Sequence, residues 1–376
     1  MSVAARLAAY YFAYFAYVGA FMPYFPLYLA SRGLDAVEIS LVVSLPQWVR
    51  VFAPSLWGWL ADRSGALRGI VVFASLALVL GWCVLPLAEG ASAIAATVAV
   101  MSILSAGAMP LVEAIALSHA ARTRGGYGPI RLWGSVGFIV VVAGAGVWLD
   151  WRPAGDLSML LPGLAVASLV ASFALPPVAR TAPAEAARRG AVRGAGLAAL
   201  LAAGFCMAVA HGALYAFYTL YLRDEGYSGT TIGALWTLGV LAEIGVFLYL
   251  RALLRRFALS AILLASFVAA ALRFAAIGAL GGSLAVLAVA QLLHAMTFGA
   301  HHSASVAAVQ RLVPEGARAR GQALYASLSN GAGGAAGAVL AGWSWDAFGH
   351  GQAFLFSAAA ALIGALFVPR LRRAGI

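Results

Sequence analysis

Charged side chains are scarce in this chain of 376 residues, since only 10% are charged while 63% are hydrophobic. Soluble globular domains carry about 25% charged residues, so this composition and a mean hydropathy of +0.93 exclude that class and indicate a membrane protein. The alternating ten-residue strand pattern of a membrane β-barrel is also missing, which leaves helices as the spanning elements.

Residue patterns for catalysis are missing as well. The sequence has only two cysteines, Cys83 and Cys206, both in apolar stretches, so a disulfide framework is not expected. It contains no nucleophile elbow, no Walker loop and no metal-ligand spacing, and its loops are too short for a soluble catalytic domain. We therefore predict a protein that is not an enzyme and that needs no cofactor and no metal.

Apolar stretches of roughly 20 residues, long enough to cross a hydrocarbon core as helices, recur along the chain. About twelve are present, which predicts an all-α membrane protein with twelve transmembrane helices. Their centres lie near Tyr17, Val49, Leu78, Ser102, Val140, Ala167, Val209, Leu241, Ser266, Ala295, Gly333 and Ala360.

Lysine is absent, so all 24 basic residues are arginine and the net charge is +11. Most of the arginines fall at the two termini and in alternate loops, whereas Arg32, Arg152 and Arg223 fall in the opposite loops. By the positive-inside rule both termini are cytoplasmic, which agrees with an even number of crossings. The basic excess thus indicates topology, not nucleic-acid binding, and we expect a monomer in the inner membrane of a bacterial-type cell.

The polar stretch 179–195 has the composition of a cytoplasmic linker and separates two bundles of six helices, 1–178 and 196–376. A constant shift of 193 positions aligns Gly33 with Gly226 and Ile39 with Ile232, which indicates an internal repeat. Two parallel six-helix repeats with a substrate held between them are typical of the major facilitator architecture.

The segment "GWLADRSGALR", from Gly58 to Arg68, resembles the loop motif that major facilitator transporters carry after their second helix. We expect Gly58 and Gly65 to let this loop turn tightly. Asp62 and Arg63 are candidates for a cytoplasmic gate, in which Asp62 pairs with an arginine or with a helix terminus. An ordinary charged turn is the alternative interpretation.

Five ionisable residues remain inside the apolar stretches: Arg50, Glu113, Arg131, Glu243 and Arg273. A charge that faces lipid costs on the order of 3 kcal/mol, so these residues should have partners in a bundle interior or an aqueous cavity. They are therefore candidates for a transport site, although structural ion pairs are the alternative.

Two of these charges carry a more specific resemblance. "PLVEAIAL" and "YGPIRLWGSVGF" resemble the fourth and fifth helices of the oligosaccharide:proton symporters and of the related phenylpropionate permeases. That resemblance implies that Glu113 and Arg131 bind substrate. Phe138 stands where lactose permease has the tryptophan that stacks on galactose, which argues against a galactoside as the substrate.

The second half extends the resemblance through "TLGVLAEIGVF", "ALRFAAIG" and "LLHAM". These motifs place Arg273 and His294 on the coupling arginine and histidine of the family, while Thr297 stands where lactose permease has a carboxylate. The repeat maps Arg50 onto Glu243, so we expect these two to meet across the halves. We favour Glu243 as the proton carrier, with Glu113 and His294 as competitors.

Three intramembrane arginines against two glutamates favour an anionic cargo, and an aromatic or other organic acid is preferred over a sugar. Tyr14 and Tyr215 are candidates for the aromatic walls of the binding site, although packing is the commoner role of such rings. We predict a proton-coupled symporter of a small organic solute that works by alternating access. The alternatives are a proton-coupled exporter, disfavoured because the fifth helix lacks a Gly-Pro pair, and a non-transporting membrane sensor.

Overall fold

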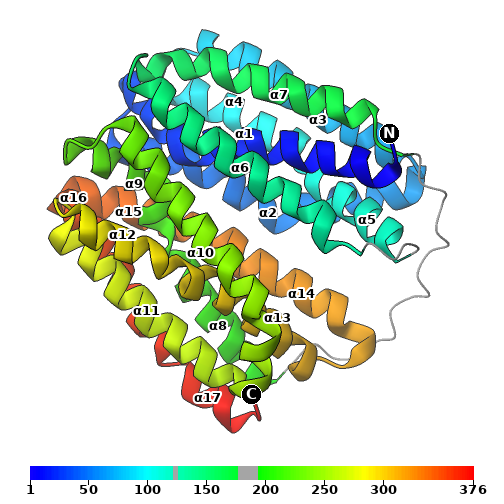
Figure 1. Cartoon of the computed structure of the whole chain (residues 1–376), viewed down its shortest axis with the longest axis vertical. Coiled ribbons are helices and arrows are strands. Elements are labelled where there is room, and N and C mark those ends of the chain that lie inside the picture. The colour runs from blue at the N-terminus through cyan, green and yellow to red at the C-terminus, as the bar shows by residue number, and fades with distance from the viewer. Residues whose placement is uncertain (122–125, 177–193) are drawn as a thin grey trace. The chain divides into compact units, whose positions relative to one another are not determined.

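The computed structural model describes residues 1–121, 126–176 and 194–376, and within these ranges every regular element is a helix (Figure 1). The first part comprises α1 (Val3–Ser31), α2 (Ala36–Ser64), α3 (Leu67–Val84), η1 (Leu85–Leu87), α4 (Gly90–Ser105), α5 (Ala108–Ala120), α6 (Gly128–Leu149), η2 (Ala154–Asp156) and α7 (Leu157–Phe173). The second comprises α8 (Ala195–Ala210), α9 (Gly212–Asp224), α10 (Gly229–Arg256), α11 (Leu259–Leu280), α12 (Leu284–Leu292), η3 (Ala295–Ala300), α13 (His301–Leu312), η4 (Glu315–Ala317), α14 (Arg318–Ala326), η5 (Ser327–Gly333), α15 (Gly334–Phe348), α16 (His350–Ala365) and α17 (Val368–Arg373).

Ten helices in the described ranges are long and apolar enough to cross a membrane. Some consist of two shorter helices, as in Gly90–Ala120 and Ala195–Asp224. Two expected spans, centred near Tyr17 and Gly333, are not among the ten, although α1 there is 29 residues long. The predicted all-helical membrane fold is confirmed, with ten of the roughly twelve expected spans meeting the criteria of length and hydropathy.

Large apolar side chains are exposed along these helices, on surfaces that carry few charges. Extended apolar surface of this kind marks contact with another apolar phase, and for helices of membrane-spanning length that phase is lipid. Examples are Leu76, Leu80, Val100, Val140, Val166, Val170, Leu248, Leu264 and Leu272.

The helices form two compact units. Unit 1 comprises Met1–Glu38, Phe52–Pro183 and Ser228–Ala234, and unit 2 comprises Ile39–Val51, Ala184–Tyr227 and Leu235–Ile376. The expected linker at 179–195 lies outside the described residues up to residue 193, and α8 begins at Ala195. The predicted boundaries of the two six-helix bundles stay a prediction.

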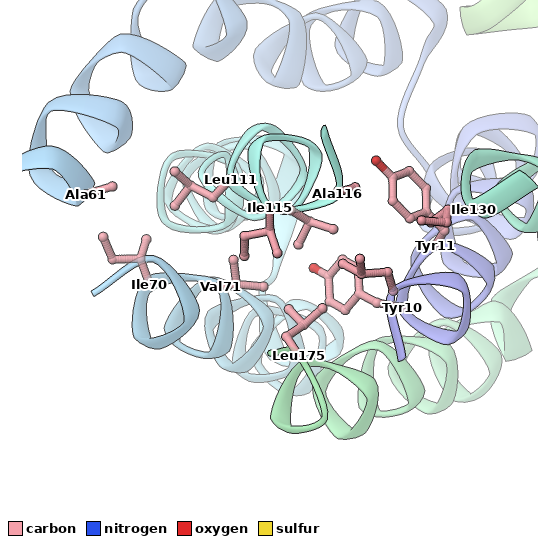
Figure 2. Close-up of a cluster of buried hydrophobic side chains, with 12 residues drawn as sticks. Tyr10, Tyr11, Ala61, Ile70, Val71, Leu111, Ile115, Ala116, Ile130 and Leu175 are labelled. Atoms are coloured by element: carbon pink, nitrogen blue, oxygen red, sulfur yellow. The ribbon is translucent and has the colours of Figure 1, made fainter. Parts of the chain in front are cut away.

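In unit 1, α1 lies against α6 and α7 (Figure 1), and its tyrosines are part of the core. Tyr10 and Tyr11 are fully buried in a cluster that joins α1 to α3, α5 and α6, as Figure 2 shows. The indole Nε1 of Trp82 donates to the Tyr17 hydroxyl at 3.1 Å and ties α3 to α1. Tyr10, Tyr11 and Tyr17 of α1 therefore pack helices together, which is the commoner role of such rings.

In unit 2, α11 packs along α16 and also contacts η3 and α13. This packing places Arg273, in the middle of α11, opposite the junction between α12 and η3. The junction matters for the site because η3 is a π-helical turn. A π-turn adds a residue to the helical repeat and is frequent at functional sites.

The prediction of a loop from Gly58 to Arg68 is wrong for most of these residues, because they are helical. α2 continues to Ser64 and α3 begins at Leu67, so only two residues form the turn. Gly65 ends α2 in the left-handed conformation, with φ of 69°, and its N–H donates to the Ala61 carbonyl at 2.8 Å. Gly58 is helical and does not contribute to the turn.

The charged gate candidates lie in the last turn of α2. Asp62 and Arg63 are both exposed, and the Arg63 guanidinium lies 5.5 Å from the ring centroid of Trp59. Among the described residues none forms an ion pair with Asp62. A gating role for these two residues stays a prediction.

Candidate substrate and proton sites

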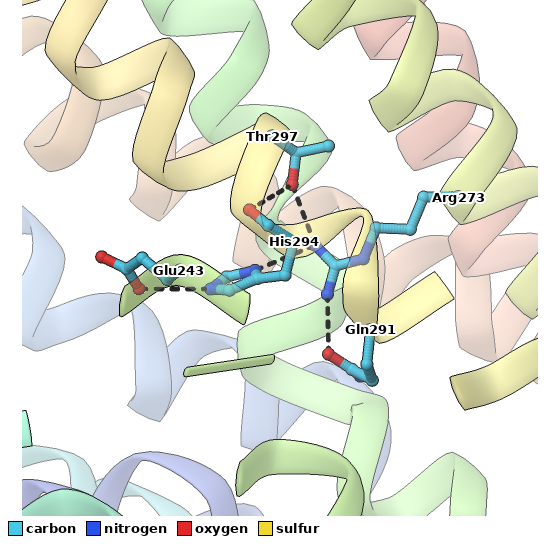
Figure 3. A network of polar contacts seen from close by, with 5 residues as sticks. All are labelled: Glu243, Arg273, Gln291, His294 and Thr297. Atoms are coloured by element: carbon cyan, nitrogen blue, oxygen red, sulfur yellow. Dashed lines mark hydrogen bonds and ion pairs between the residues drawn. The ribbon is translucent and has the colours of Figure 1, made fainter. Parts of the chain in front are cut away.

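A polar network lies within the apolar helices of unit 2 and contains Arg273, Gln291, His294, Thr297 and Glu243 (Figure 3). Its centre is the guanidinium of Arg273, which has no exposed surface. Three helical segments supply the remaining members: α10 carries Glu243, α12 carries Gln291, and the α12–η3 junction carries the other two.

Arg273 is held by neutral acceptors. Its Nη1 contacts His294 Nδ1 and donates to Thr297 Oγ1, both at 3.1 Å, and its Nη2 donates to Gln291 Oε1 at 3.1 Å. No carboxylate of the described residues lies within 4.0 Å of the guanidinium. A buried cation without an adjacent anion is costly, so the surrounding acceptors are needed to hold it.

The contact with Arg273 fixes the protonation pattern of His294. A guanidinium can only donate hydrogen bonds, so Nδ1 of the imidazole must be the acceptor. The neutral ring then carries its proton on Nε2. That nitrogen lies 3.8 Å from Glu243 Oε2. The imidazole therefore connects the buried cation to the carboxylate.

Glu243 is the acidic end of the network. Its side chain is 17% exposed and that of His294 is 10% exposed. The 3.8 Å separation is longer than a hydrogen bond, so the contact between the two is electrostatic in this arrangement. A small movement of either side chain would make it a hydrogen bond, and such a geometry suits reversible proton transfer.

The π-turn η3 positions the histidine and threonine of the network. The Thr297 hydroxyl donates to the His294 carbonyl at 3.3 Å while it accepts from Arg273. Both donor and acceptor functions of that hydroxyl are therefore used. Thr297 thus binds the arginine without supplying a negative charge.

A second polar group lies in unit 1, around Glu113 of α5. The Tyr127 hydroxyl donates to Glu113 Oε1 at 2.7 Å and lies 3.3 Å from the hydroxyl of Tyr11. Burial, followed by the hydrogen bonds with Tyr11 and Glu113, raises the pKa of Tyr127 well above its usual range. Tyr127 therefore keeps its proton at neutral pH and acts as the donor to the carboxylate.

Arg131 of α6 lies on the other side of Tyr11. Its guanidinium is 4.2 Å from the ring centroid of Phe15 and 5.8 Å from that of Tyr11. A Cβ on Gly134, one turn further along α6, would lie 2.7 Å from Arg131 Nη1, so the glycine provides the space for the guanidinium. Cation–π contacts of this kind hold the group in place while leaving its N–H edge available to an anion.

Glu113 and Arg131 do not pair directly with each other. No ion pair joins them among the described residues, and the Tyr11–Tyr127 pair provides the connection between them. Glu113 is exposed and Arg131 is half-buried. Two opposite charges are thus held apart by two phenols, an arrangement that leaves the arginine without an acidic partner.

The remaining candidate binding residues occupy different environments. Phe138 is buried on α6, where its backbone packs against Gly19 of α1. Tyr14 is half-buried and stacks on Tyr10 with ring centroids 6.1 Å apart. Roles for Phe138 and Tyr14 in binding stay predictions.

In unit 2, Tyr215 is half-buried and stacks on His211 at 5.9 Å. Arg50 is exposed on α2. Its expected pairing with Glu243 stays a prediction, as does a binding role for Tyr215.

Sequence reasoning did not assign Gln291, Tyr11 or Tyr127 to a site. Each is uncharged, so a search for intramembrane charges passes over it. Gln291 directly precedes the "LLHAM" motif and Tyr127 opens the "YGPIRLW" motif, so proximity to these motifs was the available signal.

Comparison with known proteins identifies the family. The model of the MFS_1 like family matches residues 4–356. The chain belongs to this family. Members of the MFS are transporters, so the prediction that the protein is not an enzyme is confirmed, and so is the resemblance to permeases of the phenylpropionate and oligosaccharide type.

Two relatives align with this chain over nearly its whole length. The probable 3-phenylpropionic acid transporter of Escherichia coli (strain K12) is 29% identical over 356 residues, covering 92% of each chain. The maltose permease of Geobacillus stearothermophilus is 26% identical over 362 residues, covering 95% of this chain and 91% of the permease. Both relatives are named as transporters of small organic solutes.

Solved structures share the fold. A D323A mutant of the nucleoside transporter NupG superposes with a TM-score of 0.86, covering 98% of this chain and 100% of that one at 16% identity. The POT family transporter PepTSo superposes with a TM-score of 0.75, covering 99% and 97% at 12% identity. At such low identity these likenesses establish the transporter fold and nothing about the cargo.

Proposed function

We propose that this chain is a proton-coupled symporter that carries a small organic acid across the membrane by alternating access. The observation that carries the proposal is the contact sequence Arg273–His294–Glu243, which places a basic, an amphoteric and an acidic group in series within apolar helices. Intramembrane ionisable groups are costly and are a functional site by default.

Glu243 is the proposed proton carrier. Its carboxylate stands next to the Nε2 proton of His294, so it is stabilised as an anion when that proton points toward it. When Glu243 takes up a proton, the attraction to the histidine is lost and the network relaxes. Binding of the proton and binding of the cargo both alter the attraction between Glu243 and His294. The fully loaded and empty forms therefore differ in energy from the singly loaded forms, which is the requirement for coupling.

Arg131 is the proposed anchor for the carboxylate of the cargo. Among the described residues it forms no ion pair, and its guanidinium plane is already oriented by Phe15 and Tyr11. A bidentate pair with a carboxylate is the interaction that this geometry favours. The similarity to the probable 3-phenylpropionic acid transporter supports an aromatic acid as the cargo class.

A sugar is the second candidate, because the maltose permease relative is nearly as similar. Glu113 and the two phenols beside it offer acceptors and donors that sugar hydroxyls can use. Phe138 is buried, however, and no acid of the described residues pairs with the Arg131 guanidinium, which favours an anionic cargo. The further expectations of an inner-membrane location, cytoplasmic termini and a monomeric carrier belong to the same proposal and follow from the arginine distribution.

The test uses purified protein in proteoliposomes with an imposed pH gradient, alkaline inside, and radiolabelled 3-phenylpropionate or maltose outside. We expect accumulation of 3-phenylpropionate that collapses with the gradient. Accumulation of maltose alone would favour the sugar, and efflux against the gradient would favour the exporter. Binding of either compound without flux would favour the sensor.

The variant Glu243→Gln tests the proton carrier. We expect it to lose gradient-driven accumulation while retaining counterflow, in which labelled and unlabelled substrate exchange at equal pH. Glu315→Gln is the matched control, because Glu315 has a side chain that is 90% exposed in the turn before α14. Full accumulation by Glu243→Gln would refute the assignment.

A further inference from the structure

Two more histidines are buried in unit 2 beside the Arg273–His294–Glu243 network, and that network does not include them. His211 lies between α8 and α9 and is 4% exposed, and His301 begins α13 and is 5% exposed. Each has a buried Nε2 that finds no hydrogen-bond partner among the described residues. An unpaired buried polar atom costs about 1–3 kcal/mol, so two of them call for a physical reason.

The tautomer of His211 follows from its one hydrogen bond. Its Nδ1 lies 2.8 Å from the Met207 carbonyl, and because a carbonyl only accepts, Nδ1 carries the proton. The neutral ring therefore presents Nε2 as a free acceptor. A proton can bind to this nitrogen and leave again without breaking the bond to Met207.

His211 lies next to the coupling network. Its ring centroid is 6.4 Å from that of His294, and the ring stands edge-on to Phe274 at 5.2 Å and stacks on Tyr215. The charged and titratable groups that face it are Arg273, His294, Tyr215 and His301. The free acceptor is thus surrounded by groups of the coupling network and by the next histidine.

His301 continues the series toward one end of the helix. α13 packs against α8, which His211 caps at its C-terminus, and the His301 ring stands edge-on to Phe267 at 5.4 Å. One turn further along the same buried face of α13 lies Ser305, next to the Tyr325 hydroxyl. α13 ends at Leu312, directly after Arg311 and before the arginine-rich turn at Arg318 and Arg320 that the sequence assigns to the cytoplasmic side.

We propose that His211 and His301 form a proton path inside unit 2, which connects the Glu243–His294 pair with the arginine-rich end of α13. This inference rests on the proposed proton coupling. Water molecules are the ligands that bridge the two free nitrogens, and buried water typically occupies sites with two to four polar partners. Each histidine, in the tautomer protonated on Nδ1, takes a proton from a hydronium ion on Nε2 and becomes an imidazolium. It then returns that same proton to the next water, so the first hydronium ion becomes water and the next water becomes hydronium.

The test compares His211→Gln and His301→Gln with His302→Gln in proteoliposomes. His302 is the matched control, because it is exposed while the adjacent His301 is buried. Each variant is measured in two ways: the initial rate of 3-phenylpropionate uptake driven by an imposed pH gradient, and counterflow of the same compound at equal pH. Counterflow exchanges substrate without net proton movement, so it reports folding and binding.

We expect His211→Gln and His301→Gln to lower the gradient-driven rate by roughly a hundredfold, the lower end of the range for lost acid–base groups. Counterflow should stay within about twofold of wild type, and His302→Gln should match wild type in both assays. The rate of driven uptake in D2O relative to H2O should fall further in the two variants than in wild type.

Driven uptake within about twofold of wild type in both variants would overturn the path, and so would an equal loss of driven uptake and counterflow, which indicates a structural role. If one variant shows no counterflow because it does not fold, the other decides by the same criteria. Wild-type uptake that ignores the pH gradient would instead refute the proposed proton coupling itself.

Discussion

Replacing Gln291 by leucine tests whether neutral acceptors hold the buried cation of unit 2. The variant Gln291→Leu keeps a side chain of similar volume but removes the acceptor that lies 3.1 Å from Arg273 Nη2. Gln291 is 1% exposed and Arg273 has no exposed surface, so lipid or water cannot substitute for the lost acceptor without rearrangement.

Two measured ranges of hydrogen-bond energy bound the loss of stability expected for Gln291→Leu. A hydrogen bond to a charged group contributes about 1.5–3 kcal/mol, whereas hydrogen bonds between membrane helices average about 0.6 and reach about 1.7 kcal/mol. The two ranges meet near 1.5 kcal/mol, and the complete burial of the guanidinium places this contact at the upper end of the membrane values. We therefore expect Gln291→Leu to lower the free energy of unfolding by about 1.5 kcal/mol.

SDS-induced unfolding in mixed micelles measures this change, and two further variants make it interpretable. Gln352→Leu is the control, because Gln352 is exposed on α16 in the same unit. Gln291→Glu should restore the stability, since its carboxylate also accepts from Arg273. A difference of less than about 0.5 kcal/mol between the two leucine variants would refute the argument that this acceptor holds the cation.

Three further predictions concern binding and the α2–α3 turn. Tyr127→Phe removes the hydroxyl that donates to Glu113 and should weaken 3-phenylpropionate binding about fivefold, equivalent to roughly 1 kcal/mol. The control Tyr227→Phe should leave the Kd for 3-phenylpropionate unchanged, and equal Kd values for the two variants would contradict the prediction. Arg131→Lys loses the planar guanidinium and should raise the Kd for 3-phenylpropionate at least about tenfold, while the Kd for maltose should not change. An unchanged Kd for 3-phenylpropionate would exclude Arg131 as the carboxylate anchor. Gly65 has a φ of 69°, so Gly65→Ala should lower the free energy of unfolding by about 1 kcal/mol or more. Gly58→Ala, within the α2 helix, should leave it unchanged or raise it by up to about 1 kcal/mol. SDS-induced unfolding that ranks the two variants in the opposite order would refute the turn assignment.

The membrane fold was readable from the sequence because hydropathy and arginine placement are properties of long segments. A run of about 20 apolar residues needs no tertiary information to be recognised as a spanning helix. The same is true of the rule that intramembrane charges seek partners. Arg273 and Glu243 were selected on their cost and His294 on its resemblance to the family's coupling histidine, and the structure brings all three into one network. Selection by cost, however, says nothing about who the partners are.

The local geometry was not readable, for two physical reasons. A π-turn such as η3 has no distinct hydrophobic period, so nothing in the sequence announced that His294 and Thr297 both face Arg273. Glycine is also ambiguous: Gly58 and Gly65 look alike in the motif, yet only the second adopts a positive φ. The expected loop therefore proved to be the end of a long helix.

The separation of Glu113 from Arg131 had the same kind of cause. Their spacing in sequence placed both on adjacent helices, but whether two long side chains meet depends on what lies between them. Here Tyr11 and Tyr127 intervene, and phenols are neutral residues that charge counting leaves out. An aromatic pair between opposite charges keeps each available to a ligand, which a direct ion pair would not.

The exchange of a carboxylate for Thr297 determines where the negative charge of unit 2 resides. With a threonine beside Arg273, the nearest acid in the network is Glu243, one imidazole away. The attraction between the buried cation and this acid is therefore transmitted through His294, whose tautomer the arginine fixes. Protonation of Glu243 removes the acid of this network, so the buried guanidinium is less well stabilised in the protonated form. In the proposed symport, this energy difference between the protonated and deprotonated forms is what couples proton binding to reorientation of the carrier.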